Sequence, residues 1–215
     1  RRYLAACSSS TRGVFGGGYL PNTNTIDYIT IASVGNATDF GDLSETRGRF
    51  SSCSSSTRGV FAGGQNPSTT NTIDYITIAT TGNATDFGDL TVARFGNAAC
   101  SSSTRGVFGG GYIFPITNTI DYITIATTGN ATDFGDLTVA RGDFSSCSNS
   151  TRGVFGGGGT GGSPFASNII DYITIATTGN ATDFGDLTTI RGSLSACSSS
   201  TRGVFGGGYA PASSN

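Results

Sequence analysis

The chain repeats itself every 46 to 50 residues, and this periodicity constrains its fold more than any other feature. The string Cys-Ser-Ser-Ser-Thr-Arg-Gly-Val-Phe recurs with Asn149 as its one substitution, beginning at Cys7, Cys53, Cys100, Cys147 and Cys197. An arginine lies six residues before each cysteine, so the sequence divides into units 1–46, 47–93, 94–140, 141–190 and a partial unit 191–215. Such periodicity indicates one repeat domain over residues 1–215, in which each unit packs against its neighbours.

Each unit contains four runs of strand-forming residues separated by turn residues. In the second unit we expect strands over residues 50–56, 59–64, 72–79 and 86–92. On the third strand Ile73 and Tyr75 point to one side, while Asp74 and Ile76 point to the other. Both faces of this strand are largely apolar, so it should lie between neighbouring sheets. No apolar stripe has the period of a helix. A four-stranded unit of this length is typical of a blade of an all-β propeller.

Four features of the second unit resemble a known repeat: Arg47 before the first strand, Gly63-Gly64 after the second, Asp74-Tyr75 on the third and Phe87 on the fourth. They are similar to those of kelch-type β-propeller repeats, although the aspartate and aromatic residue are reversed and Phe87 stands where kelch has tryptophan. The resemblance implies a ring of four-stranded antiparallel blades, five in number once the half unit is completed. The amino-acid sequence of the repeat also resembles that of glycine-rich repeat proteins of phages and environmental sequences, which are commonly taken as virion- or tail-associated.

The partial fifth unit contains only the first two strands of a blade. Because exposed sheet edges pair readily with other chains, we expect self-association, or contact with neighbouring virion or fibre subunits, through this incomplete blade. Two alternatives stay open: residues upstream of Arg1 could supply the missing strands, or the ring could close with a two-stranded last blade. The chain begins at Arg1 without a methionine, which indicates that translation began further upstream.

The units differ mainly in two segments, the loop between the second and third strands and the stretch after each initial arginine. Both segments emerge on the same side of an antiparallel blade, so one face of the disc is diversified and the other is uniform. Since binding usually resides in loops on a rigid scaffold, we expect the loops to contact a surface ligand such as a glycan. The candidates are Tyr19, Leu20, Gln65, Asn66, Tyr112, Ile113, Phe114, Thr160 and Phe165. The alternative is that exposed loops vary because little constrains them.

Composition excludes several classes of function. There is no histidine, lysine, methionine or tryptophan, and the net charge is −2. Without histidine, Ser-His-Asp chemistry, Cys-His proteases and histidine–zinc sites are excluded. No basic surface for nucleic acid is indicated, and no apolar run is long enough for a membrane-spanning helix. We therefore expect no cofactor, no metal, no nucleic-acid partner and no membrane insertion.

The repeated cysteines, arginines and asparagines are interpreted first as structural. The cysteines should be compact apolar fillers near the axis, with a thiolate ring for a soft metal as the alternative. We expect the series Arg12, Arg58, Arg105, Arg152 and Arg202 to bond to repeated aspartates such as Asp27. Asp39 and Asp42 could bind calcium, but their spacing supplies few ligands. Five glycosylation sequons begin at Asn36, Asn83, Asn130, Asn180 and Asn149. The competing explanation is that Gly-Asn turns supply positive φ.

These observations favour a non-enzymatic function. Near-identical duplication and one diversified face suit a structural or adhesive module of a virion, tail appendage or extracellular fibre, located outside the cell or on a virion surface. The alternative is a kelch-type protein–protein interaction scaffold. A third class, a propeller glycosidase or lyase, would need one blade with unique carboxylates, and only Glu45 and Asp143 break the repeat.

Overall fold

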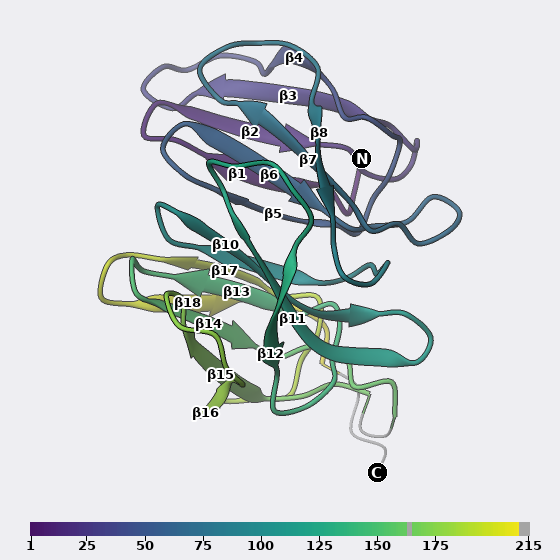
Figure 1. Cartoon of the computed structure of the whole chain (residues 1–215), viewed down its shortest axis with the longest axis vertical. Helices are drawn as coiled ribbons and strands as arrows, with labels where there is room; N and C mark the ends of the chain where they lie inside the picture. The colour runs from purple at the N-terminus through teal and green to yellow at the C-terminus, as the bar shows by residue number, and fades with distance from the viewer. Residues whose placement is uncertain (163–164, 211–215) are drawn as a thin grey trace.

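The computed structural model describes residues 1–162 and 165–210, and within these residues every regular element is a β-strand. Figure 1 shows the strands gathered into separate small sheets that follow one another along the chain. Four sheets have four antiparallel strands each, in sequence order, and a fifth has two. In the part of the chain that the structure describes, no helix has the length and apolarity needed to cross a membrane.

The strands recur at the same places in each unit. The first blade consists of β1 (Ala5–Ser8), β2 (Arg12–Gly16), β3 (Thr25–Thr30) and β4 (Thr38–Asp42). The second consists of β5 (Ser51–Ser54), β6 (Arg58–Ala62), β7 (Thr72–Thr77) and β8 (Thr85–Asp89). The third consists of β9 (Ala98–Ser101), β10 (Arg105–Tyr112), β11 (Ile116–Thr124) and β12 (Thr132–Asp136). The fourth consists of β13 (Ser145–Ser148), β14 (Arg152–Gly156), β15 (Ile169–Thr174) and β16 (Thr182–Asp186). The half-blade consists of β17 (Ser195–Ser198) and β18 (Gly203–Gly206). The four strands expected in the second unit are confirmed, each within a few residues.

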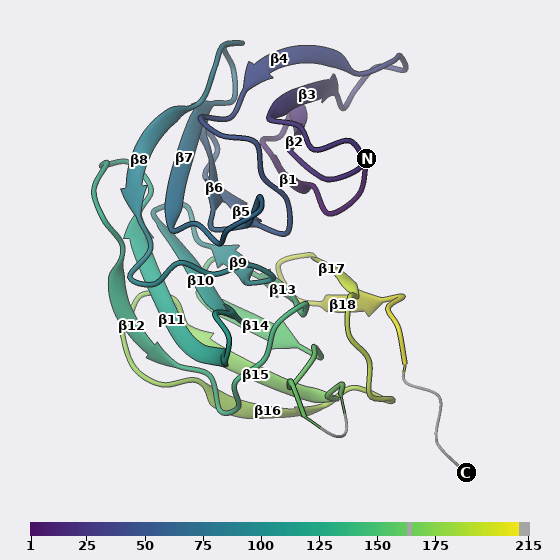
Figure 2. The ribbon, with the colours of Figure 1, turned by 90° about the vertical axis from the view of Figure 1, so that its right-hand side faces the viewer.

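The blades are arranged in an arc around a common axis, with β1 at one end and the half-blade at the other (Figure 2). The short first strand of each blade is innermost, and serines on it connect one blade to the next. Ser52 Oγ donates to the Ala6 carbonyl at 2.7 Å, and Ser54 Oγ donates to the Ser8 carbonyl at 2.9 Å. Ser198 makes the same bond to Ser148 at the other end of the arc. The serine-rich repeat therefore holds the inner strands together. This arrangement is a β-propeller.

The hydrophobic core lies between blades. One face of the first blade, including Val14 and Phe40, packs against Phe61, Ile76 and Ile78 of the second. Ile73 and Phe87 lie on the opposite face of the second blade, in contact with the third. The expectation that the third strand is sandwiched between two sheets is therefore confirmed, and the alternation of its side chains is the reason.

The cysteines fill the narrow space between inner strands. A Cβ placed on Gly106 would lie 2.7 Å from the sulfur of Cys53, and one on Gly59 would lie 2.6 Å from that of Cys7. All five cysteines are free, and the first four are buried. Burial raises the pKa of Cys7 to about 12, so its thiol is neutral. The filler interpretation is confirmed, and the glycine of each Arg-Gly-Val-Phe string makes room for the sulfur.

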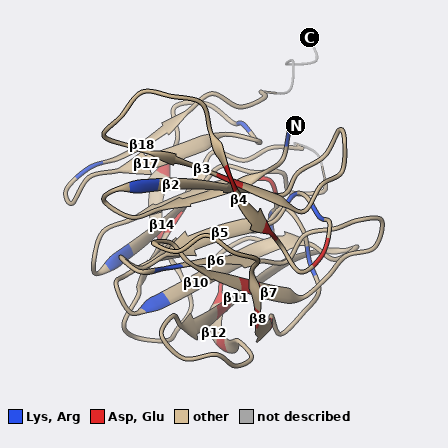
Figure 3. Ribbon diagram, turned by 90° about the horizontal axis from the view of Figure 1, so that it is seen from above, with Lys and Arg blue, Asp and Glu red and all other residues tan. Residues whose placement is uncertain are grey.

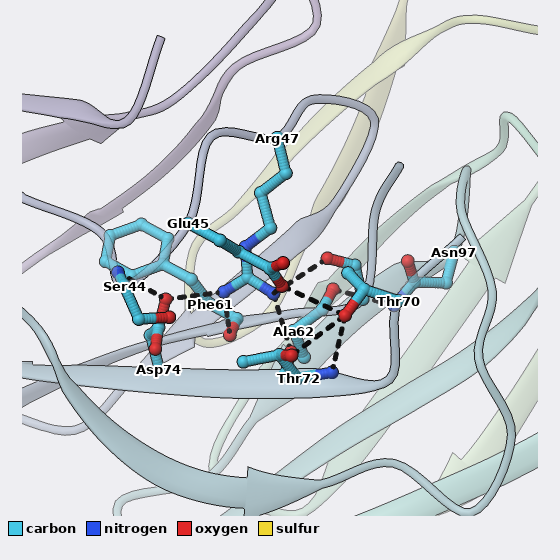
Figure 4. Close-up of polar contacts among 10 residues, drawn as sticks. Ser44, Glu45, Arg47, Phe61, Ala62, Thr70, Thr72, Asp74 and Asn97 are labelled. Carbon is cyan, nitrogen blue, oxygen red and sulfur yellow. Dashed lines mark hydrogen bonds and ion pairs between the residues drawn. The ribbon is translucent and has the colours of Figure 1, made fainter. Parts of the chain in front are cut away.

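Ion pairs join the start of each complete unit to its third strand, and three of these four pairs are buried. Arg47 and Asp74 are 1% and 0% exposed, and Arg47 Nη2 lies 2.8 Å from Asp74 Oδ2 (Figure 4). Arg47 also donates to the carbonyls of Gly63 and Thr72. The equivalent pairs elsewhere are Arg1–Asp27, Arg94–Asp121 and Arg141–Asp171. Burial lowers the pKa of the Arg94 guanidinium, and the charge of Asp121 opposes that shift.

The assignment of the aspartates to the Arg12 series was wrong. Arg12 instead lies over the ring of Tyr28, 4.3 Å from its centroid, and donates to the Ile78 carbonyl of the next blade at 2.8 Å. Arg58 repeats this arrangement with Tyr75 and Ile125. Arg12 and Arg58 are the first residues of β2 and β6, and Figure 3 shows basic residues in blue on the ribbon. The two arginine series have the same number of members, so counting could not distinguish which one faces the carboxylates.

The uniform turns between third and fourth strands fasten each blade to the previous one. Asn83 Oδ1 accepts from the Asp42 amide at 3.0 Å, and the Gly82 amide donates to the Phe40 carbonyl at 2.7 Å. Gly82, and not the asparagine, has positive φ, at 154°. Gly88 permits the same approach at the next junction, because a Cβ there would lie 2.5 Å from the Gly129 backbone. The turns of the second, third and fourth blades therefore form part of the junctions between blades.

Candidate functional site

The two variable segments of each unit lie side by side on one face. The stretch after the initial arginine pairs with the loop between the second and third strands through isolated antiparallel bridges. These bridges are Arg2–Tyr19, Gly48–Gln65, Phe95–Tyr112, Gly142–Gly159 and Gly192–Tyr209. The expected grouping of both variable segments on one face is therefore confirmed. We call this surface the diversified face.

Five equivalent residues surround the axis at the centre of the diversified face. Each has a positive φ between 49° and 66°: they are Tyr3, Arg49, Gly96, Asp143 and Ser193. Their backbones form a continuous chain of hydrogen bonds, in which the Arg49 amide donates to the Tyr3 carbonyl at 2.9 Å and the Asp143 amide to the Gly96 carbonyl at 2.8 Å. The backbone is therefore repeated while the side chain differs in every unit. We call these five residues the mouth residues.

The mouth residues line a cavity of about 280 Å³ with an aromatic and charged wall. The Arg49 guanidinium lies 4.6 Å from the ring centroid of Tyr3 and 5.6 Å from that of Phe95. Burial raises the pKa of Asp143, and the charge of Arg49 opposes that shift. Because Gly96 has no side chain, it leaves room for the Asp143 carboxylate; a Cβ at position 96 would lie 2.8 Å from Asp143 Oδ1. A cation, a carboxylate and an aromatic ring thus converge at the axis.

Aromatic residues continue outward from the mouth. Phe95 is stacked on Tyr112 with centroids 5.2 Å apart, and Phe114 lies 5.8 Å from Phe95. Phe114 is 81% exposed. Phe95 is 3% exposed and Tyr112 is half-buried, so of these three rings Phe114 is the one that presents a face to a ligand.

The structure divides the predicted loop residues into two groups. Tyr19 and Tyr112 are half-buried because their rings cover Gly48 and Gly142 of the following unit. Gln65 exchanges backbone hydrogen bonds with Gly48, and Asn66 accepts a hydrogen bond from Asn22. These residues support the loops. The exposed residues Leu20, Phe114 and Phe165 are free to contact a ligand, while Ile113 and Thr160 are half-buried. Residues 163–164 of the fourth loop lie outside the described residues, as do residues 211–215 of the last unit.

Sequence reasoning did not select Tyr3, Arg49 or Asp143 as candidate binding residues. They belong to the short stretch after each initial arginine, and the variation of this stretch between units is a sequence signal that could have identified them. Their convergence depends on the left-handed backbone at this position, which tyrosine and arginine rarely adopt. The residue types therefore gave no indication of it.

Four of the five sequon asparagines have structural partners. Asn83, Asn130 and Asn180 each accept an amide hydrogen bond from the previous blade. Asn149 closes its own turn by accepting from the Arg152 amide at 2.8 Å. Asn36 is exposed. Glycosylation of these residues stays a prediction.

The distribution of carboxylates bears on metal binding and acid–base chemistry. In residues 1–162 and 165–210, no three Cys, Asp or Glu side chains gather closely enough to hold a metal ion. Among the described residues that line the mouth cavity, Asp143 is the one carboxylate. Glu45 instead lies 3.8 Å from Arg47 and accepts a hydrogen bond from Thr70.

Comparison with known proteins agrees with the propeller fold. The solved structure of YjhT superimposes with a TM-score of 0.81 at 9% sequence identity, covering 96% of this chain and 72% of that one. At this identity the likeness concerns the fold alone. No protein family model matches the chain, and no curated protein matches it.

Proposed function

We propose that the protein is a non-enzymatic binding module whose diversified face holds a glycan of a cell or particle surface, and that it serves as part of an extracellular or virion appendage. The observation that carries this proposal is the meeting of Tyr3, Arg49 and Asp143 at one cavity, with the exposed ring of Phe114 on the same face. Aromatic rings pack against the apolar faces of sugars, while Arg49 supplies hydrogen-bond donors for hydroxyl or carboxylate oxygens.

The repeat architecture supports the same proposal. The side chains at the mouth differ in all five units, while the contacts between blades are nearly uniform. A rigid scaffold with changeable loops is a common design for recognition. The single carboxylate at the described mouth also contrasts with the pair of carboxyl groups that glycosidases ordinarily use.

The test is a glycan array with the protein, followed by titration of the retained glycan. We expect Phe114→Ala and Arg49→Gln each to weaken binding by about tenfold or more, as central aromatic and arginine residues do at other interfaces. Val34→Ala is the matched control, because Val34 is 103% exposed on the opposite, uniform face. Its affinity should equal that of the parent protein.

Two other outcomes would favour other functions. Capture of a folded protein through the same face, without glycan binding, would support an interaction scaffold. Hydrolysis or elimination of a retained glycan that is lost in Asp143→Asn would support an enzyme. Equal glycan binding by Phe114→Ala, Arg49→Gln and the control Val34→Ala would contradict the proposed site.

A further inference from the structure

Two opposite charges face the mouth cavity without forming an ion pair with each other. Arg49 of the second unit and Asp143 of the fourth both line this cavity. In the part of the chain that the structure describes, the ion pairs join other arginines to other aspartates or to Glu45, and none includes Arg49 or Asp143. Burial raises the pKa of Asp143, and the charge of Arg49 opposes that shift, so the two groups share one electrostatic environment. The cavity therefore presents one positive and one negative group to a ligand.

Gly96 of the third unit connects the two charged residues through its main chain. Its amide donates to the Arg49 carbonyl at 2.6 Å, and its carbonyl accepts from the Asp143 amide at 2.8 Å. The other four mouth residues carry side chains, whereas position 96 contributes none to the cavity. A Cβ there would also lie 3.1 Å from the ring of Tyr112, so the glycine keeps open the room beside the carboxylate.

Both charged side chains have hydrogen-bonding capacity left for a ligand. The main-chain amide and carbonyl of Asp143 bond to Gly96 and Ser193, but no donor among the described residues bonds to its carboxylate. A half-buried carboxylate without a donor is costly, so a donor from a ligand would stabilise it. The Arg49 guanidinium lies over the ring of Tyr3 and carries several N–H donors, more than the single oxygen of that side chain accepts.

The ligand group that suits both charges is a hydroxyl, because its O–H donates and its oxygen accepts. One hydroxyl can donate to Asp143 while a neighbouring hydroxyl accepts from Arg49, and hydrogen bonds to ionised groups are the stronger kind. An anionic ligand would pair with Arg49 but would bring its charge beside that of Asp143, and such a meeting of like charges opposes binding. A cationic ligand meets the same opposition from Arg49. The cavity therefore favours an uncharged ligand with neighbouring hydroxyl groups.

We propose that the mouth cavity recognises a neutral sugar through two neighbouring hydroxyl groups, one bound by Arg49 and the other by Asp143. This inference rests on the proposed function, because it names the class of glycan that the diversified face holds. Asp143 is the specificity-determining residue: it accepts from a hydroxyl of the sugar and excludes acidic sugars by its charge. Gly96 leaves the room that this hydroxyl occupies.

The probes are oligosaccharides that end in glucose, galactose or mannose, immobilised beside the same oligosaccharides ending in the matching uronic acid or 6-amino-6-deoxy sugar. We expect the 215-residue protein to retain neutral members. Their acidic and amino counterparts should bind about tenfold or more weakly, because each brings a like charge to Asp143 or to Arg49. This comparison leaves the protein unchanged, so it does not depend on a variant that folds.

A protein variant tests the role of the carboxylate. Asp143→Asn should weaken binding of the neutral members by about tenfold and narrow their advantage over the acidic members. Asp86→Asn makes the same chemical change at an exposed position of β8 and should alter neither. Acidic members that bind as tightly as neutral ones, or unchanged neutral binding by Asp143→Asn, would overturn this inference while glycan binding itself stands. A protein that retains no oligosaccharide would overturn the proposed function as well.

Discussion

The sulfur of Cys53 rests against the α-carbon of Gly106 on the next blade, with no room for a methyl group between them. This contact recurs at every junction between a complete blade and its successor, from Cys7 with Gly59 to Cys147 with Gly203. The cysteine and the glycine are separated by about one repeat in the sequence, yet they form one packing unit.

Gly106→Ala should therefore destabilise the protein by about 1–3 kcal/mol through overpacking. Gly13→Ala is the matched control, since Gly13 has the same place in its unit but no cysteine against it. Urea unfolding should show a smaller loss of unfolding free energy for Gly13→Ala than for Gly106→Ala. A Cys53→Ala, Gly106→Ala double variant should recover part of the loss. Equal losses at both glycines would show that the cysteine contact is not the cause.

The arginine–aspartate ion pairs should contribute differently to the free energy of unfolding, because their side chains differ in exposure. Asp121→Asn leaves the fully buried Arg94 without its counter-charge and should cost about 3–5 kcal/mol. Asp27→Asn should cost distinctly less, because the Arg1 and Asp27 side chains are 17% and 34% exposed. Thermal or urea unfolding measures both. A cost at Asp27 as large as that at Asp121 would contradict the role assigned to burial.

The cysteines should make stability depend on alkaline pH. The pKa of Cys7 is raised from 9.0 in the unfolded chain to about 12 in the folded protein, because burial disfavours the thiolate. Its contribution to stability is fully present below pH 9 and is lost as pH rises from 9 toward 12, since only the unfolded chain then ionises. The free energy of unfolding should fall over this range less steeply in Cys7→Ala than in the parent protein. The other ionisable groups are the same in both proteins, so their contributions cancel in the comparison.

The turns of the uniform face should be sensitive to substitution at one glycine. Gly88→Ala brings a methyl group against the Gly129 backbone, whereas Gly185→Ala meets nothing within 4 Å. Both positions have a positive φ, at 139° and 127°, so both variants bear the strain of that conformation. We expect Gly88→Ala to cost more than Gly185→Ala by about 1 kcal/mol or more in unfolding experiments. A difference near zero would mean that the junction can open without cost.

The strands and their packing could be predicted because their signals are local. The alternation in Ile-Asp-Tyr-Ile placed Asp74 and Ile76 on one side of the third strand, and the structure agrees. The sequence could not show which arginine meets Asp74, because Arg47 and Arg58 both recur once per unit. That choice depends on the strand register, in which Arg58 lies opposite Thr77 while Asp74 lies opposite Phe61, beside Arg47.

The uniform turns and the mouth were predicted less well. The sequence offers a sequon or a positive-φ turn at Asn83, whereas in the structure its side chain accepts a hydrogen bond from the Asp42 amide of the previous blade. The candidate binding residues predicted from the sequence lie in the loops and do not include Tyr3 or Arg49. A left-handed backbone conformation, which is unusual for tyrosine and arginine, brings these two residues to the axis. The neighbouring residue types do not predict this conformation.

The hydrogen-bonded chain that runs from Tyr3 to Ser193 uses only main-chain atoms. The identity of the side chain at each of these positions is therefore independent of the bonds that hold the ring of blades together. A changed side chain at a mouth position leaves these main-chain bonds in place, although at Gly96 it would meet Asp143 Oδ1. The centre of the disc therefore combines one repeated main-chain scaffold with a side chain that differs from unit to unit.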